Sequence, residues 1–364
     1  MMNQIPSIRE LRWWGPLGLL CLLSPTFLPK EIYTGGFNPL HWSLSAWLFW
    51  LPAWIAAWDL RELNRADPMA EPFATLGWAN RLTMLRGLLL GALAGFILQP
   101  AASSWLPALC CAGALALDRI DGMVARQSGK CSLFGLMLSR LYDAVALVIV
   151  PLVALCFGKL HESYMLTGVA YFAFVAGSYW RTLRNLPVAP LLPSPTRRLL
   201  RGAQMGFAAL LLCPPFAAPL TRWLGLFFMT PFLLGYMLDW WQVSGVYDPQ
   251  SPINAARRQT LDAFVQARAL PALRLLLALW LLTQPFGAPI WLSLPLALSL
   301  ALGLWTRVGA ALFLLTLALS TGDGNVSTLT LAACASAVAL LLYGGGAFSL
   351  HRGDEAWLRR VLAA

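Results

Sequence analysis

Long apolar runs, separated by short polar stretches, fill this sequence from one end to the other. A helix needs about 20 apolar residues to cross the hydrocarbon core of a bilayer, and most of these runs have that length. The pattern therefore predicts an all-α, polytopic membrane protein with about twelve transmembrane helices. The runs cover residues 13–29, 42–58, 82–98, 104–124, 132–157, 163–180, 203–218, 223–241, 271–286, 288–305, 308–320 and 326–345.

Composition supports the same fold class. Of the 364 residues, 59% are hydrophobic and 12% are charged, whereas soluble domains are about 45–50% apolar and about 25% charged. These values exclude a soluble globular protein, a disordered chain and a secreted disulfide scaffold. The seven cysteines are scattered through apolar runs without a C-x-x-C pair, so we interpret them as small apolar side chains.

The net charge of +10 is explained by topology. If the N-terminus lies in the cytoplasm and the runs alternate, 23 of the 26 Lys and Arg residues fall on the cytoplasmic side. Only Lys30, Lys159 and Arg222 fall on the other side. Basic residues are retained in cytoplasmic loops, so we predict that both termini are cytoplasmic and that no nucleic acid is bound.

Three segments are predicted along the chain. Residues 1–66 hold two spans, residues 67–245 hold about six, and residues 246–364 hold a polar linker followed by about four spans. The tryptophans of the first segment are interpreted as anchors at the membrane interface. They are Trp13, Trp14, Trp42, Trp47, Trp50, Trp54 and Trp58.

Carboxylates within the apolar runs are the strongest candidates for function, because a charge inside a spanning helix costs at least about 2.5–3.5 kcal/mol. Asp118 and Asp121 are three residues apart and share one helix face. Gly135, Ser139 and Asp143 follow at intervals of four and share a face of the next helix. The polar break at residues 127–130 makes the two helices antiparallel neighbours.

The spacing predicts that Asp118, Asp121 and Asp143 converge at a similar depth. Carboxylates repel one another in a medium of low dielectric constant unless a cation neutralises them, and Mg²⁺ or Mn²⁺ prefers such oxygen ligands. The small residues Gly122, Ala125 and Gly135 leave room for a ligand near the backbone. The alternative is that the aspartates form buried ion pairs with Arg119, Arg126 and Arg140.

This region resembles the CDP-alcohol phosphotransferase family. The family pattern D-x2-D-G-x2-A-R-x8-G-x3-D-x3-D matches from Asp118 to Asp143 at every fixed position except the third aspartate, which is Ser139 here. Asn80, Thr83 and Arg86 resemble the family's N-x-x-T-x-x-R motif in the first core helix. Residues 193–204, which include Arg197 and Arg198, resemble more loosely the P-S-x-x-G-K-x-x-T-x-x-Q motif of the fifth.

The resemblance implies a six-helix core at about residues 67–245. It also implies an enzyme that moves a phosphatidyl or phospho-alcohol group from a CDP-linked donor, such as CDP-diacylglycerol, to an alcohol and releases CMP. One or two Mg²⁺ or Mn²⁺ ions would be held by Asp118, Asp121 and Asp143, and Asp143 would be the general base. Arg197 and Arg198 would form a rim for phosphate or lipid headgroups. The nucleotide would be bordered by Asn80, Thr83, Arg86, Asp118, Gly122, Ala125, Arg126 and Gly135.

By the same resemblance we expect a homodimer in a bacterial inner membrane, with membrane lipids as partners and the active site facing the cytoplasm. Ser139 keeps a second function open: a catalytically degenerate protein that binds nucleotide or lipid. A third alternative is a transporter, which the number of spans allows. No repeat relates the two halves, however, and the carboxylates lie on one adjacent helix pair.

The last segment resembles a DoxX-type four-helix membrane module. Residues 303–311 and 342–350 carry similar G-x-x-T-R and Y-G-x-G-x-x-S-L stretches. Small residues of this kind let helix backbones approach closely. Because no nucleophile, metal cluster or acid–base pair is evident there, we expect a structural or accessory role.

Overall fold

The computed structural model describes residues 6–28, 36–99, 105–192, 194–216, 218–283, 290–320, 326–351 and 353. Apart from one isolated bridge between Leu304 and His351, the regular secondary structure of these residues is helical. The predicted all-α class is therefore confirmed. Lys30 and both chain ends lie outside the described residues.

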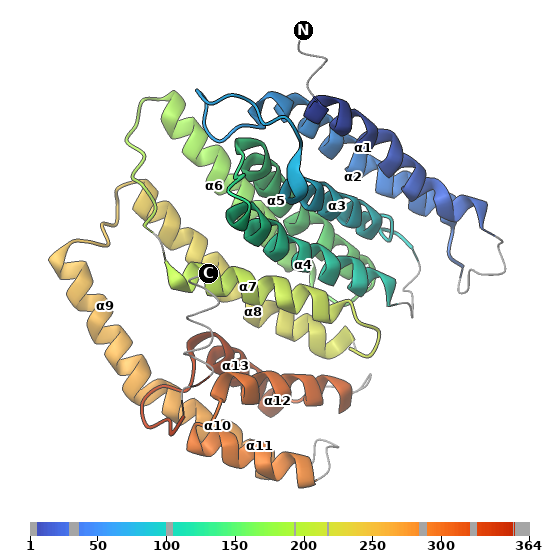
Figure 1. Cartoon of the computed structure of the whole chain (residues 1–364). Coiled ribbons are helices and arrows are strands. Elements are labelled where there is room, and N and C mark those ends of the chain that lie inside the picture. Colours follow the sequence, from blue (N-terminus) through green and yellow to red (C-terminus); the bar gives the residue numbers. More distant parts are fainter. Residues whose placement is uncertain are drawn as a thin grey trace. The chain divides into compact units, whose positions relative to one another are not determined.

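Each predicted apolar run overlaps an α-helix, with boundaries that differ by several residues (Figure 1). One further helix, α9 (Pro252–Phe264), begins inside the polar stretch expected to be a linker, and the π-helical turn Val265–Ala269 joins it to α10. Pro252 supplies a backbone angle suited to a first helical turn. The other helices are α1 (Pro6–Leu23), α2 (Pro39–Asp59), α3 (Gly77–Ala94), α4 (Leu106–Gln127), α5 (Leu133–Cys156), α6 (Leu166–Leu183), α7 (Pro195–Leu211), α8 (Ala218–Val243), α10 (Leu270–Thr283), α11 (Ile290–Leu302), α12 (Thr306–Ser320) and α13 (Thr328–Tyr343).

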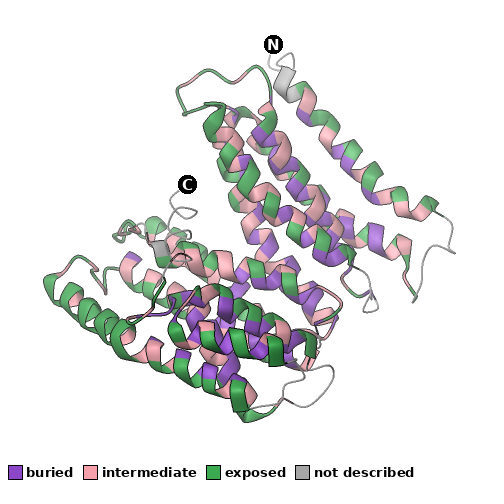
Figure 2. Cartoon of the chain, turned by 60° about the horizontal axis from the view of Figure 1, so that its bottom comes forward, coloured by how far each residue is buried: buried purple, intermediate pink, exposed green. Residues whose placement is uncertain are grey.

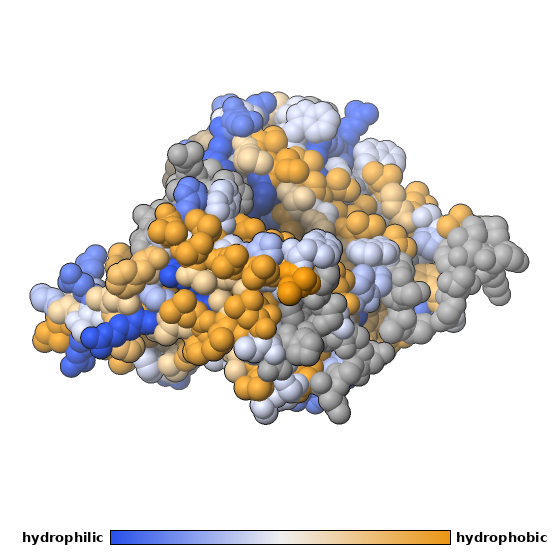
Figure 3. All heavy atoms as spheres, turned by 90° about the horizontal axis from the view of Figure 1, so that it is seen from below, coloured by the Kyte–Doolittle hydropathy of each residue, from blue (hydrophilic) through white to orange (hydrophobic). Residues whose placement is uncertain are grey.

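Two of the described helices are long and apolar enough to cross a membrane by length and composition: Leu133–Cys156, and the continuous helix Pro252–Thr283. Others are short, such as α11 with 13 residues and α12 with 15. The twelve predicted spans are therefore not confirmed. Apolar side chains nevertheless cover much of the face seen in Figure 3, and many large ones are exposed, including Leu48, Leu276 and Trp291.

The chain divides into two compact units. The first is Met1–Gly158 with Ala208–Pro214, and the second is Lys159–Phe207 with Pro215–Ala364. In the first unit, α3 is the central element: it packs against α2, α4 and α5. Helices α4 and α5 hardly contact each other, so the expected neighbouring pair is joined through α3.

The tryptophans of α2 do not lie as membrane-interface anchors would, which corrects the prediction made from the sequence. Trp50 is 0% exposed and packs between Gly18 of α1 and Gly91 of α3. Figure 2 shows how buried, intermediate and exposed positions alternate along the helices. Three indoles at one face of α2 also hold α1 by hydrogen bonds to its carbonyl groups. Trp47 donates to Leu19 (3.2 Å), Trp50 to Gly15 (3.5 Å) and Trp54 to Leu11 (3.3 Å).

In the second unit, α6 packs against α8, and α10–α13 pack on one another. The glycine-rich stretches 303–311 and 342–350 meet around Arg274, which is buried. Its guanidinium donates to the carbonyl oxygen of Gly345 (3.1 Å) and to Oγ of Ser349 (2.7 Å). Gly303 adopts a φ of +69° beside this guanidinium, so these glycines serve close packing.

Candidate active site

Helix α3 presents three polar side chains to its neighbours α4 and α5. Asn80, Thr83 and Arg86 follow one another at intervals of three residues, which places them within one side of the helix. All three are buried. Each contacts a different part of the region that carries the aspartates, so the N-x-x-T-x-x-R motif is a line of contacts between helices.

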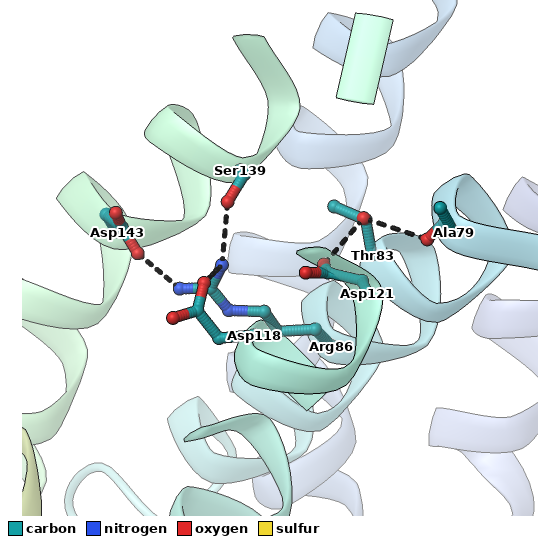
Figure 4. A network of polar contacts seen from close by, with 7 residues as sticks. All are labelled: Ala79, Thr83, Arg86, Asp118, Asp121, Ser139 and Asp143. Atoms are coloured by element: carbon teal, nitrogen blue, oxygen red, sulfur yellow. Dashed lines mark hydrogen bonds and ion pairs between the residues drawn. The ribbon is translucent and has the colours of Figure 1, made fainter. Parts of the chain in front are cut away.

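Arg86 lies between two of the predicted metal ligands (Figure 4). Its Nη1 donates to Oδ1 of Asp118 (2.6 Å) and lies 3.2 Å from Oγ of Ser139, while its Nη2 donates to Oδ1 of Asp143. The Arg86 side chain is only 2% exposed, against 33% for Asp118 and 29% for Asp143. The structure thus brings Asp118, Ser139 and Asp143 together on one guanidinium.

Asp121 engages a different partner. Its Oδ2 accepts a hydrogen bond of 2.7 Å from Thr83 Oγ1, which also lies 3.1 Å from the carbonyl oxygen of Ala79. Asp121 is buried. Asp118 and Asp121 therefore share one face of α4, as their spacing predicts. That face meets α3, where the two aspartates contact different residues (Figure 4).

Asn80 connects α3 to the start of α5. Its Nδ2 donates to Oδ1 of Asn64 (3.0 Å) and to Oγ of Ser132 (3.0 Å). The Ser132 hydroxyl also caps α5, because it accepts a hydrogen bond from the backbone N–H of Gly135. A Cβ at position 135 would overlap Oδ1 of Asn80. The space beside Gly135, which we expected to border a nucleotide, is thus filled by the Asn80 amide.

The remaining predicted nucleotide contacts lie on α4. Gly122 and Ala125 are partly exposed and Arg126 is exposed. The nearest atom to a Cβ at Gly122 would be Nη1 of Arg126 at 3.4 Å, an ordinary contact distance. The alternative of ion pairs to flanking arginines is replaced by the pairing with Arg86, since Arg119 and Arg140 are exposed.

The predicted basic rim belongs to the second unit. Arg197 donates to Oδ1 of Asp239 (2.6 Å) and to the carbonyl oxygen of Leu192 (3.1 Å). Its charge is therefore already paired within its own unit. Arg198 follows it in α7 and is exposed.

A comparison with family models supports the resemblance found in the sequence. Residues 76–240 match the family model of CDP-alcohol phosphatidyltransferase. This region of the chain is similar to that family. The match runs from just before α3 into α8. Searches of curated proteins and of solved structures returned no match. The DoxX-like resemblance of residues 260–350 stays a prediction.

CDP-alcohol phosphatidyltransferases are integral membrane transferases and are generally dependent on a divalent metal. The arrangement here does not fit the predicted three-carboxylate cluster. Within the described ranges, no three Asp, Glu, His or Cys side chains are placed to hold a metal ion. The guanidinium of Arg86 lies between Asp118 and Asp143, and Asp121 accepts from Thr83.

Sequence reasoning assigned Arg86 to the nucleotide and missed its contact with the aspartates. A signal was present, because Arg86 lies within the apolar run 82–98. A cation buried in such a run needs a counter-charge, and the carboxylates of the next two runs can supply it. The hydrogen bonds from Asn80 to Asn64 and Ser132 could not be predicted in the same way, since short polar residues near helix ends are common.

Proposed function

We propose that this protein is a membrane transferase of phospholipid synthesis. It moves a phosphatidyl or phospho-alcohol group from a CDP-linked donor to an alcohol and releases CMP. We propose further that the reaction occurs at the cytoplasmic face of a bacterial inner membrane, in a homodimer whose chains have both termini in the cytoplasm. The observation that carries the proposal is the family match over α3–α8, together with the convergence of Asp118 and Asp143.

The reaction requires one proton acceptor and a place for a pyrophosphate. The alcohol oxygen attacks the phosphorus distal to the cytidine, and the bond from that phosphorus to the bridging oxygen breaks. The bridging oxygen and its electron pair leave with CMP. In our proposal Asp143 accepts the alcohol proton, since a carboxylate within hydrogen-bond reach serves as a general base. Gly122 and Ala125, which are partly exposed, border the nucleotide on α4.

A second function is supported by one observation. Ser139 replaces a charged residue of the family pattern, and Arg86 forms ion pairs with two of the remaining carboxylates, which leaves one net negative charge among the three groups. A site whose carboxylates are paired in this way suits a protein that binds a CDP-linked lipid without cleaving it.

Release of radiolabelled CMP from CDP-diacylglycerol separates the two functions. The full-length protein, reconstituted in lipid with Mn²⁺ or Mg²⁺, is offered a panel of alcohols. CMP release that depends on the alcohol supports the transferase. Binding of CDP-diacylglycerol without CMP release, in the unaltered protein and in Ser139→Asp alike, supports the binding function.

A further inference from the structure

Arg86 has the position and the contacts of a bound cation. Its guanidinium touches three oxygen-bearing side chains from two helices, Asp118 of α4 and Ser139 and Asp143 of α5. The arginine itself is buried, whereas the two carboxylates remain about one-third exposed. Hard oxygen ligands converging from two elements are the surroundings that a divalent ion would require.

Charge balance explains why the guanidinium can occupy this place. Asp118 and Asp143 meet at the same guanidinium, and carboxylates that lie close together repel one another unless a cation lies between them. Arg86 offers its two terminal nitrogens to different carboxylates, Nη1 to Asp118 and Nη2 to Asp143, and such charge-assisted hydrogen bonds are stronger than neutral ones. Ser139 adds a neutral hydroxyl at 3.2 Å where the family pattern has a third negative charge. The single positive charge is therefore shared by two carboxylates.

We propose that Arg86 stands in for a divalent cation between Asp118 and Asp143, so that a metal ion and the arginine compete for these two carboxylates. A metal ion binds the pair only when the guanidinium is displaced. This competition for the two carboxylates does not require that the chain turns over a substrate.

If the two cations compete, a substitution that weakens the ion pairs of Arg86 with Asp118 and Asp143 should raise the affinity for the metal ion. The full-length protein in lipid nanodiscs is titrated with Mn²⁺, and the free ion is measured by its electron paramagnetic resonance signal. Arg86→Gln removes the competing charge, and we expect its Mn²⁺ affinity to rise at least about tenfold over that of the unaltered protein. Arg140→Gln is the matched control, because Arg140 is exposed and follows Ser139 directly on α5. We expect the affinity of that variant to change by less than about threefold.

Arg86→Lys is a second variant, chosen because Arg86→Gln removes a buried charge and could fail to fold. Lysine keeps the charge but presents one ammonium group, which cannot serve both carboxylates as the guanidinium fork does. One carboxylate is then released, and Mn²⁺ affinity rises although the net charge is unchanged. Thermal unfolding of each variant shows whether it is folded before the titration.

Three results would overturn the proposal. The first is weaker Mn²⁺ binding in Arg86→Lys or Arg86→Gln, because the arginine would then be positioning the metal ligands. The second is unchanged binding in both variants. The third is an equal gain in Arg140→Gln, because the effect would then be one of general charge.

Discussion

The hydroxyl group of Thr83 donates a 2.7 Å hydrogen bond to the carboxylate of Asp121. Both side chains are buried, so this contact joins α3 to α4 in a place with little water. We expect Thr83→Val, which keeps the shape and removes the donor, to lower the free energy of unfolding by about 1–3 kcal/mol. The measurement is denaturant unfolding of the detergent-solubilised protein.

Thr83→Ser is the control for this prediction, because it keeps the hydroxyl group and loses only a methyl group. It should retain most of the stability that Thr83→Val loses. If the valine variant is as stable as the unaltered protein, the hydrogen bond to Asp121 contributes nothing measurable.

Gly135 and Gly122 give opposite predictions for the same substitution. A Cβ at Gly135 overlaps the Asn80 amide, so Gly135→Ala should separate Asn80 from Ser132 and cost about 1–3 kcal/mol of stability. At Gly122 the nearest atom lies at 3.4 Å, so Gly122→Ala should fold normally. If Gly122 borders the nucleotide, Gly122→Ala weakens CDP binding in a titration without loss of stability. A stable Gly135→Ala variant would contradict this account.

Much of this architecture could be predicted from the sequence. Each apolar run overlaps a helix among the described residues, because a long apolar segment satisfies its backbone hydrogen bonds within a helix. The break between α4 and α5 was also readable: Gly129 adopts a φ of +64°, and Ser132 caps α5. The order of the helices along the chain does not show which of them pack against each other, however. Arrangement around α3 depends on side chains such as Arg86 that reach past their own helix.

The tryptophans show the same limit. Composition suggests interface anchors, but Trp50 is buried because Gly18 and Gly91 lie opposite it on two other helices. The complementarity of a large side chain and a distant glycine is a tertiary property. The spacing of Trp47, Trp50 and Trp54 places them on one helix face, but nothing within the segment 42–58 shows which helices that face meets.

Ser139→Asp restores the charge that the family pattern places at this position. The new carboxylate would accept from Arg86 Nη1, which lies 3.2 Å from the serine hydroxyl. Because it draws the guanidinium away from Asp118, we expect greater CMP release with Mn²⁺ than in the unaltered protein. Ser139→Asn is the control of similar size without the charge and should give no gain. Lower CMP release in Ser139→Asp would show that serine is the better residue here.

Gly303→Ala tests the second unit. The φ of +69° disfavours a side chain, and a Cβ would overlap the guanidinium of Arg274. We expect a loss of about 1–3 kcal/mol in stability, measured by denaturant unfolding. CMP release per folded molecule should be unchanged if α10–α13 have a structural role. A loss of turnover in protein that remains folded would instead assign this module a part in the reaction.

Asp143→Asn tests the proposed base with little change in shape. The amide cannot accept the alcohol proton as a carboxylate does, so CMP release should fall by about 10²–10⁴-fold. The Oδ1 atom still accepts from Arg86, and CDP binding, measured by titration, should be largely retained. Glu10→Gln is the matched control, since it weakens another ion pair in the same unit, to Arg81 at 2.6 Å. That control should keep its turnover. Substantial CMP release from Asp143→Asn would mean that another group takes the proton.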